Sequence, residues 1–263
     1  MDTPTGTGVK SIDRAWALLA SLGEAGQPLT VRDLARRTGL PRPTVYRLVD
    51  ALARHGAVVI QDGTVAVGHR VLWLAGQRLA QLELRAAGRP YLMDLCRQVG
   101  ETVHLGVLEQ GHVVYIDKVE PPRPLRMAST IGAIMPAHST ALGKAMLAWS
   151  DPRAVREIVA QRGLPRRTPR TITTLARLQR ELAAVRARGF AVDNVENEDG
   201  IRCVGAPIFD HRGRVAGAVS ISGSVSTISL RRAREELGPR VRETAARISR
   251  VLGWSGAQKG GLP

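Results

Sequence analysis

The chain has 263 residues, of which 44% are apolar, and a formal net charge of +15 at pH 7. This length is enough for two domains with their own cores. We expect a cytoplasmic protein with no membrane partner, because no stretch approaches the ~18 uncharged residues of a membrane span and the first residues lack a signal-peptide core.

Residues 29–56 have the pattern of two helices joined by a tight turn. Thr30 is a favourable N-cap for a helix that runs to Thr38, and Gly39 is the residue type that ends helices in a left-handed conformation. Pro43 suits the first turn of a second helix. The apolar residues of that helix recur at i, i+3, i+4 and i+7, as on a buried face: Val45, Leu48, Val49 and Leu52.

Two flanking patterns extend this segment. Residues 11–22 predict a further helix, and Asp62-Gly63 between two β-branched runs predicts a hairpin. Three helices and a hairpin make a winged helix-turn-helix, in which the second helix of residues 29–56 enters the DNA major groove. The alternative interpretation of residues 29–56 is an ordinary helical hairpin with solvated arginines.

The helix at 11–22 is expected to close the small core of this domain with four apolar residues: Ile12, Trp16, Leu19 and Leu22.

The basic residues of this region are few but well placed. Arg47 would face outward together with Thr44, and arginine binds guanine while threonine contacts phosphate or a thymine methyl. Residues 1–68 hold eight basic and six acidic side chains, a net charge of only +2. We therefore treat the charge of the remaining chain as a background field and not as a second DNA site.

Helical spacing from His69 to Leu84 predicts a connecting helix. Gly88 and Pro90 should break it, and a second helix should then run to Gly100. The remaining elements suggest an α+β domain with a mostly antiparallel sheet. They are strands at 102–108, 113–119 (after a turn at Glu109-Gln110-Gly111) and 125–131, helices at 139–149, 151–161 and 175–188, strands at 190–193, 202–209 and 215–222, and a helix at 230–252.

The chain resembles full-length transcriptional regulators of the isocitrate lyase regulator (IclR) family. The resemblance is carried by SIDRAWALLASL with the helix-turn-helix and wing, by PAHSTALGKAMLA at 136–148, and by GFAVDNVENEDGIRCVGAPIFDHRGRVAGAVSISG at 189–223. It implies a winged helix-turn-helix DNA-binding domain at 9–68, a linker helix at 69–86, and an effector-binding domain like the GAF and PAS folds at 87–254.

The family implies a DNA-binding regulator, a repressor or an activator, of catabolic or transport genes. Such a protein binds double-stranded DNA at a pseudo-palindromic operator as a homodimer or homotetramer, responds to a small carboxylate-type effector, and uses no cofactor or catalytic residue. The wing near Asp62 and Gly63 is a weaker candidate for DNA contact. The residues expected to contact DNA are Thr30, Arg32, Pro41, Arg42, Pro43, Thr44, Tyr46 and Arg47.

The same resemblance implies an effector pocket. Its apolar wall would be Met127, Met135, Ala141, Leu142 and Ile201, and its polar positions Asp193, Cys203, Ser220 and Ser222. Ser220 and Ser222 lie two apart on a strand and so share one face, although that face could instead be solvent-exposed. Asp193 would have to be protonated, donate through a water, or contact another part of the ligand. Thr130 and Ala133 would set selectivity, while His104 and His138 could touch the ligand but are expected to be structural.

Other chemistry has little support in the sequence. Gly143-Lys144 lacks the rest of a phosphate-binding loop, and Ser220 and Ser222 lack the flanking glycines of a nucleophile elbow. Cys96 and Cys203 form no CxxC, and the acidic loop Glu196, Glu198 and Asp199 lacks EF-hand spacing, so we predict no metal site. The alternatives are a ligand-independent DNA-binding scaffold and an enzyme-like C-terminal domain with an accessory DNA-binding domain.

Overall fold

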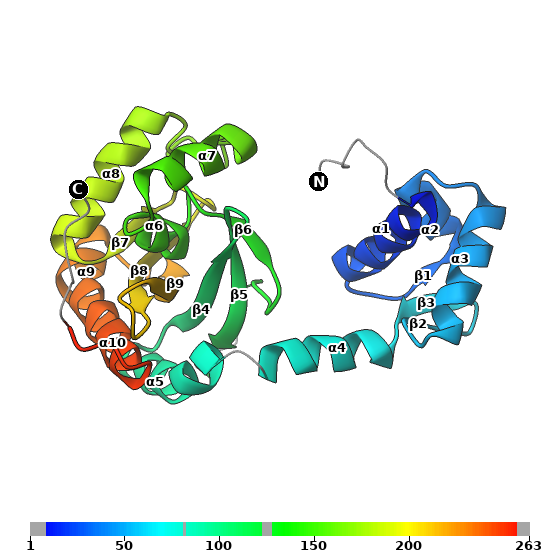
Figure 1. Cartoon of the computed structure of the whole chain (residues 1–263), viewed down its shortest axis with the longest axis horizontal. Coiled ribbons are helices and arrows are strands. Elements are labelled where there is room, and N and C mark those ends of the chain that lie inside the picture. Colours follow the sequence, from blue (N-terminus) through cyan, green and yellow to red (C-terminus); the bar gives the residue numbers. More distant parts are fainter. Residues whose placement is uncertain (1–8, 81–82, 123–127, 257–263) are drawn as a thin grey trace. The chain divides into compact units, whose positions relative to one another are not determined.

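The computed structural model describes residues 9–80, 83–122 and 128–256. The chain divides into two compact units, Met1–Gln81 and Leu82–Pro263 (Figure 1). Within the described residues, no helix combines the length and the apolar character needed to cross a membrane. The elements of the first unit are α1 (Lys10–Ala25), β1 (Leu29–Thr30), α2 (Val31–Thr38), α3 (Arg42–Arg54), β2 (Val58–Gln61), β3 (Thr64–Val67) and α4 (His69–Ala80).

The helix-turn-helix forms as its sequence predicts. The Thr30 hydroxyl accepts a hydrogen bond from the Asp33 backbone N–H at 3.2 Å and caps α2, which ends at Gly39 with a φ of 68°. The wing turns through Asp62 and Gly63, both with positive φ, and joins β2 to β3. The two-residue strand β1, too short to show a period, pairs with β3 and completes a three-stranded sheet.

One part of the predicted N-terminal core is wrong. Leu18 and Leu22 of α1 are buried and Leu19 is partly buried, whereas Ile12 and Trp16 are 65% and 68% exposed. Two residues along a helix correspond to a rotation of about 200°, so Trp16 points away from the side on which Leu18 lies. The core therefore forms around the later turns of α1 and leaves an apolar stripe on its outer side.

The predicted helix break at Gly88 and Pro90 is also wrong, because α5 (Glu83–Val99) runs through both residues. Gly88 is buried, and a Cβ there would lie 3.1 Å from the Leu105 side chain, so this glycine allows close packing of α5 on the sheet. Pro90 and Ala86 are both exposed. Proline frees the carbonyl four residues earlier, and at this exposed position water can bind it.

The C-terminal unit is an α+β domain around one six-stranded sheet, as predicted. Every neighbouring pair of strands is antiparallel, and their order is β6-β5-β4-β9-β8-β7. The strands are β4 (Thr102–Glu109), β5 (His112–Val119), β6 (Ile134–Pro136), β7 (Ala191–Asn194), β8 (Ile201–Phe209) and β9 (Val215–Ser224). The helices after α5 are α6 (Ala141–Leu147), α7 (Pro152–Arg162), α8 (Leu175–Arg188), α9 (Leu230–Arg232), the π-helical turn η1 (Ala233–Leu237) and α10 (Gly238–Val251).

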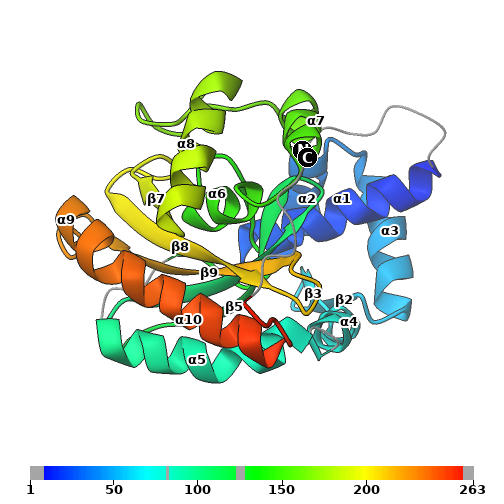
Figure 2. The same ribbon diagram turned by 60° about the vertical axis from the view of Figure 1, so that its left-hand side comes forward.

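Two helical layers cover the sheet. Helices α5 and α10 lie side by side on one face, and α6 and α8 lie on the other (Figure 2). The predicted strand at 125–131 is not found in its described part, 128–131, and its first residues, including Met127, lie outside the described residues. A short strand forms three residues later as β6, where Ile134–Pro136 pairs with β5.

Glycines bring α6 into close contact with the sheet. A Cβ at Gly143 would lie 2.2 Å from the Ala137 carbonyl oxygen, and one at Gly205 of β8 would lie 2.9 Å from the Ala141 backbone. Real Cβ atoms do not approach so closely, so both positions favour glycine. As a result, the start of α6 lies directly over β8 and beside the polar residues of the sheet.

Candidate functional site

Most of the predicted DNA-contacting residues lie on and around the start of α3, while Thr30 and Arg32 lie at the start of α2. Arg42, Pro43, Tyr46 and Arg47 are exposed, while Val45 and Val49 on the opposite side of the helix are buried. Exposed polar and basic side chains on this helix are what base and phosphate contacts require. Of the remaining predicted contacts, Arg32 and Pro41 are exposed and Thr44 is partly buried. The hydroxyl of Thr30 is already engaged, since it donates to Asp33 at 2.7 Å.

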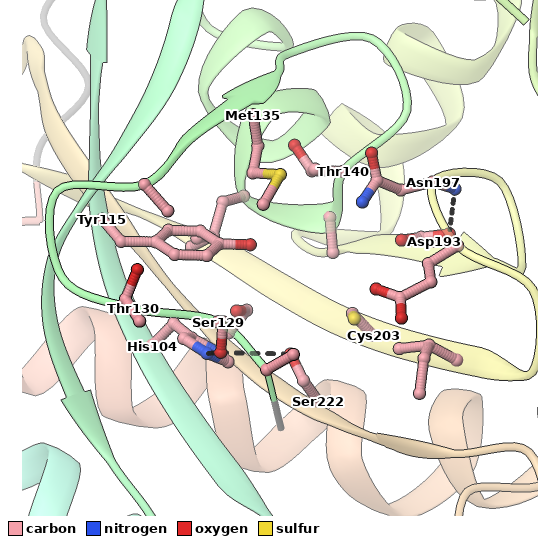
Figure 3. Close-up of a pocket in the computed structure, with 17 residues that line it drawn as sticks. His104, Tyr115, Ser129, Thr130, Met135, Thr140, Asp193, Asn197, Cys203 and Ser222 are labelled. Atoms are coloured by element: carbon pink, nitrogen blue, oxygen red, sulfur yellow. Dashed lines mark hydrogen bonds between the residues drawn. The ribbon is translucent and has the colours of Figure 1, made fainter. Parts of the chain in front are cut away.

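A cavity of about 150 Å³ lies between the sheet, the start of α6 and the loop at 128–133. The structure brings eight of the nine predicted effector residues to its walls: Met135, Ala141, Leu142, Asp193, Ile201, Cys203, Ser220 and Ser222. The ninth, Met127, lies outside the described residues. Figure 3 shows Tyr115 on one side of this cavity, with Asp193 and Asn197 on the opposite side.

Strand register explains why these side chains converge. Asp193 of β7 is opposite Cys203 of β8, which is opposite Ser222 of β9, and Ser220 of β9 is opposite His104 of β4. Residues opposite each other across neighbouring strands project to the same face of a sheet. Ser220 and Ser222 are both buried, so the alternative of two solvent-facing serines is wrong.

Sequence reasoning missed part of the lining. Thr130, Ala133 and His104, which the sequence had singled out, do lie in the wall. The other lining residues come from long-range strand pairing or from loops without periodicity, and none of them was assigned to the pocket from the sequence: Tyr115, Ala128, Ser129, Thr140, Asn197 and Glu198. Thr140 has a second role, since its hydroxyl caps α6 by accepting from the Gly143 N–H at 3.2 Å.

His104 connects the sheet to the loop that closes the cavity. Its Nε2 lies 2.7 Å from the Ser129 hydroxyl and its Nδ1 lies 3.3 Å from the Ser222 hydroxyl. The ring stacks on Tyr115 with centroids 4.8 Å apart. Burial, with the nearby charge of Lys118, lowers the pKa of His104 to about 3, so the imidazole is neutral at physiological pH. His138 lies outside this cavity, and its Nε2 donates to the Pro165 carbonyl at 3.1 Å.

Asp193 is the most perturbed acid of the cavity. Its burial raises the pKa to about 7, against the opposing effect of Lys144. Its Oδ1 accepts hydrogen bonds from the backbone N–H groups of Glu196 at 2.7 Å and Asn197 at 3.3 Å. Near neutral pH the carboxyl group therefore exists in both protonation states, and its protonated form can donate a hydrogen bond.

Apart from the carboxyl groups of Asp193 and Glu198, the polar groups of the cavity are neutral donors and acceptors. Burial raises the pKa of the Cys203 thiol and of the Tyr115 hydroxyl, so both stay protonated near pH 7. A protonated thiol is a poor nucleophile. Among the described lining residues, none is a lysine or an arginine. An anionic ligand in this cavity would therefore be held by hydrogen bonds and apolar contacts and not by a direct ion pair with a lysine or an arginine.

Behind the cavity, Lys144 forms a buried ion pair that the sequence did not reveal. Its Nζ is fully buried and donates to Glu196 Oε1 at 2.5 Å and to the Val192 carbonyl at 2.7 Å, with Glu181 at 3.4 Å. Glu196 is thus engaged in an ion pair. Within the part of the chain that the structure describes, no group of three His, Cys, Asp or Glu side chains could hold a metal ion.

Comparison with known proteins gives consistent matches for both units. Residues 11–62 match the family described as the IclR helix-turn-helix domain, and residues 76–250 match the bacterial transcriptional regulator IclR C-terminal family. The glycerol operon regulatory protein of Streptomyces coelicolor is 37% identical over 248 residues, which cover 93% of this chain and 97% of that protein.

Two solved structures are similar over nearly the full length. The IclR protein of Thermotoga maritima is 33% identical with a TM-score of 0.78, covering 94% of this chain and 100% of that one. An IclR homologue of Microbacterium hydrocarbonoxydans, solved as a complex with 4-hydroxybenzoate, is 26% identical with a TM-score of 0.79, covering 92% of this chain and 98% of that one.

Proposed function

Because the chain belongs to the IclR family of bacterial transcriptional regulators, we propose that α3 reads a pseudo-palindromic operator through Arg42, Tyr46 and Arg47. The exposure of these three side chains on the outer face of a helix-turn-helix supports this assignment. We assign DNA binding to residues 9–68 and effector binding to residues 87–254, with the segment 69–86 as the connection between them.

An apolar surface on the N-terminal unit supports a homodimer. Ile12 and Trp16 of α1 and Leu72 and Trp73 of α4 are between 49% and 68% exposed. Large apolar side chains with this much exposure are typical of protein interfaces. A palindromic operator also requires two recognition helices, so a second copy of the chain is the occupant that we propose for this surface.

The dimer can be tested by sedimentation velocity without DNA. We expect that changing both Trp16 and Leu72 to glutamate converts the dimer to a monomer. Changing Val59 to glutamate is the matched control, because Val59 is also an exposed apolar residue of this unit, at 47%, but lies on the wing. A double variant that sediments as a dimer would show that this surface is not the interface.

The cavity supports a small organic acid as the effector. Its serine and threonine hydroxyls can donate to a carboxylate, the protonated form of Asp193 can do the same, and Met135 and Leu142 supply apolar wall. A few polar groups in a partly apolar cavity are typical of a small-molecule site. The Microbacterium homologue bound to 4-hydroxybenzoate, a small carboxylate, gives independent support.

The main support for an effector-controlled regulator is that eight predicted effector residues line one cavity in a protein with a helix-turn-helix domain. The test is a footprint on DNA upstream of the gene and its neighbours, at fixed salt, with and without a panel of small organic acids. We expect a protected palindrome that one acid changes. If no acid alters protection or raises the melting temperature of the protein, the ligand-independent scaffold is the better explanation.

A further inference from the structure

A second hollow in the C-terminal unit, of about 490 Å³, has walls dominated by arginine. Four guanidinium groups reach it from two adjacent segments and from a third that is more than 40 residues further along the chain. Arg170 comes from the loop before α8, Arg177 and Arg188 come from the two ends of α8, and Arg234 comes from η1. We call this group of side chains the arginine hollow. It lies apart from the effector cavity, although Glu196 lines the hollow and its neighbour Asn197 lines the cavity.

The carboxylates of the arginine hollow do not neutralise it. Glu181 pairs with Arg188 at 2.7 Å, and Glu196 pairs with the buried Lys144 at 2.5 Å. Among the described residues, no ion pair involves Arg170, Arg177 or Arg234. Three positive charges therefore remain around one concave surface, where they repel each other and favour an anion between them.

The backbone that carries Arg170 is held firmly in place. The Thr168 hydroxyl donates to the Val195 carbonyl at 2.7 Å, and the Thr171 hydroxyl donates to the Glu196 carbonyl at 2.6 Å. The Arg170 N–H donates to the Thr168 hydroxyl at 3.1 Å. These bonds tie the loop to the segment after β7, so little backbone entropy would be lost when a ligand binds.

Two further features favour an anion. Arg177 lies in the first turn of α8, where the helix dipole disfavours a cation but favours a bound anion beside it. Behind the hollow, Arg202 donates to Asn194 at 2.9 Å, and its pKa is lowered by burial and then by the charge of Arg170. Arg202 thus adds a fifth guanidinium group next to Asn194, which lines the hollow.

We propose that the arginine hollow binds a phosphorylated small metabolite, with its phosphate on Arg170, Arg177 and Arg234. The planar fork of guanidinium matches phosphate oxygens, and a phosphate carries up to two negative charges near pH 7. The volume of the hollow is that of small-ligand sites, which supports a metabolite as the source of the phosphate. This site is independent of the organic acid in the effector cavity.

The test is isothermal titration calorimetry of the full chain with pyrophosphate, at an ionic strength fixed with sodium chloride. We expect one pyrophosphate per chain. Arg177→Gln and Arg234→Gln should each weaken its binding at least about tenfold, because each removes charge-assisted hydrogen bonds. Arg156→Gln is the matched control: Arg156 is an exposed arginine of the same unit outside the hollow, and its loss should change affinity less than about twofold.

Three results would overturn the proposal. If Arg156→Gln weakens pyrophosphate binding as much as the hollow variants do, binding depends only on the overall charge of the protein. If the parent protein shows no heat of binding, the hollow does not bind this phosphate.

The third result concerns DNA as the source of phosphate. We expect operator footprints of Arg177→Gln and Arg234→Gln to be unchanged. Loss of operator binding in these variants, without any pyrophosphate affinity in the parent, would assign the arginines to DNA.

Discussion

Replacing Lys144 by methionine should strongly destabilise the C-terminal unit. The change removes the ammonium group that donates to Glu196 and to the Val192 carbonyl, and leaves a nearly buried carboxylate without its partner. Breaking a buried ion pair from one side costs about 3–5 kcal/mol. For a domain of this size, that cost corresponds to a decrease of about 6–20 °C in melting temperature.

Differential scanning calorimetry of the full chain measures this effect as a shift in the unfolding transition of the C-terminal unit, which is the larger of the two units. The control is Arg156→Met, which removes one positive charge from an exposed position and should stay within about 0.5 kcal/mol of the parent. Adding Glu196→Gln to Lys144→Met should raise the melting temperature above that of the single variant, because the uncompensated charge is gone.

The pH dependence of the defect has a definite sign. Burial raises the pKa of Glu196 and Lys144 opposes this, so removal of Lys144 raises the pKa further. A carboxyl group with a raised folded-state pKa contributes stability at low pH that is lost as the pH rises through that pKa. Lys144→Met should therefore be more destabilised at pH 8 than at pH 5.5. A defect equal to that of Arg156→Met at both pH values would refute the reasoning.

Three further predictions concern function. Arg47→Ala should weaken operator binding by about 1–3 kcal/mol in fluorescence anisotropy at fixed salt, and unchanged affinity would remove Arg47 from the interface. Ser220→Ala combined with Ser222→Ala should leave operator binding intact and abolish the response to the organic acid, so a retained response would contradict the cavity assignment. Binding of a carboxylate effector should weaken about tenfold between pH 6 and pH 8, because Asp193 ionises near pH 7 and its charge repels the ligand. Asp193→Asn should abolish this pH dependence in calorimetric titrations, and a persistent slope would show that another group is responsible.

Local rules predicted most of the helices and strands. Thr30 and Gly39 marked the ends of α2, and the turn at Glu109-Gln110-Gly111 marked the hairpin of β4 and β5. Pro90 shows where such rules fail, because a proline at a solvent-exposed position of a helix need not end it. Ile12 and Trp16 fail for another reason: their apolar character predicts burial, but the core within one unit does not reach them.

The candidate site was only partly predictable, because much of its lining comes together through contacts between distant parts of the chain. Asp193, Ser220 and Ser222 were found because they lie in motifs that resemble a known family, and alternation placed both serines on one face. Tyr115 and Asn197 join them through strand pairing and loop contacts. Lys144 and Glu196 are 52 positions apart, so their ion pair depends on how α6 lies on the sheet and has no counterpart in local sequence.

Thr130 and Ala133, in the loop at 128–133, give the cavity a wall whose side chains should tolerate substitution. Thr130 is exposed and Ala133 only partly buried, whereas Asp193 belongs to a segment that also holds the Lys144 ion pair. Substitutions in this loop can therefore change ligand recognition with little loss of folding stability. This property suits the engineering of biosensors and the divergence of effector specificity after gene duplication.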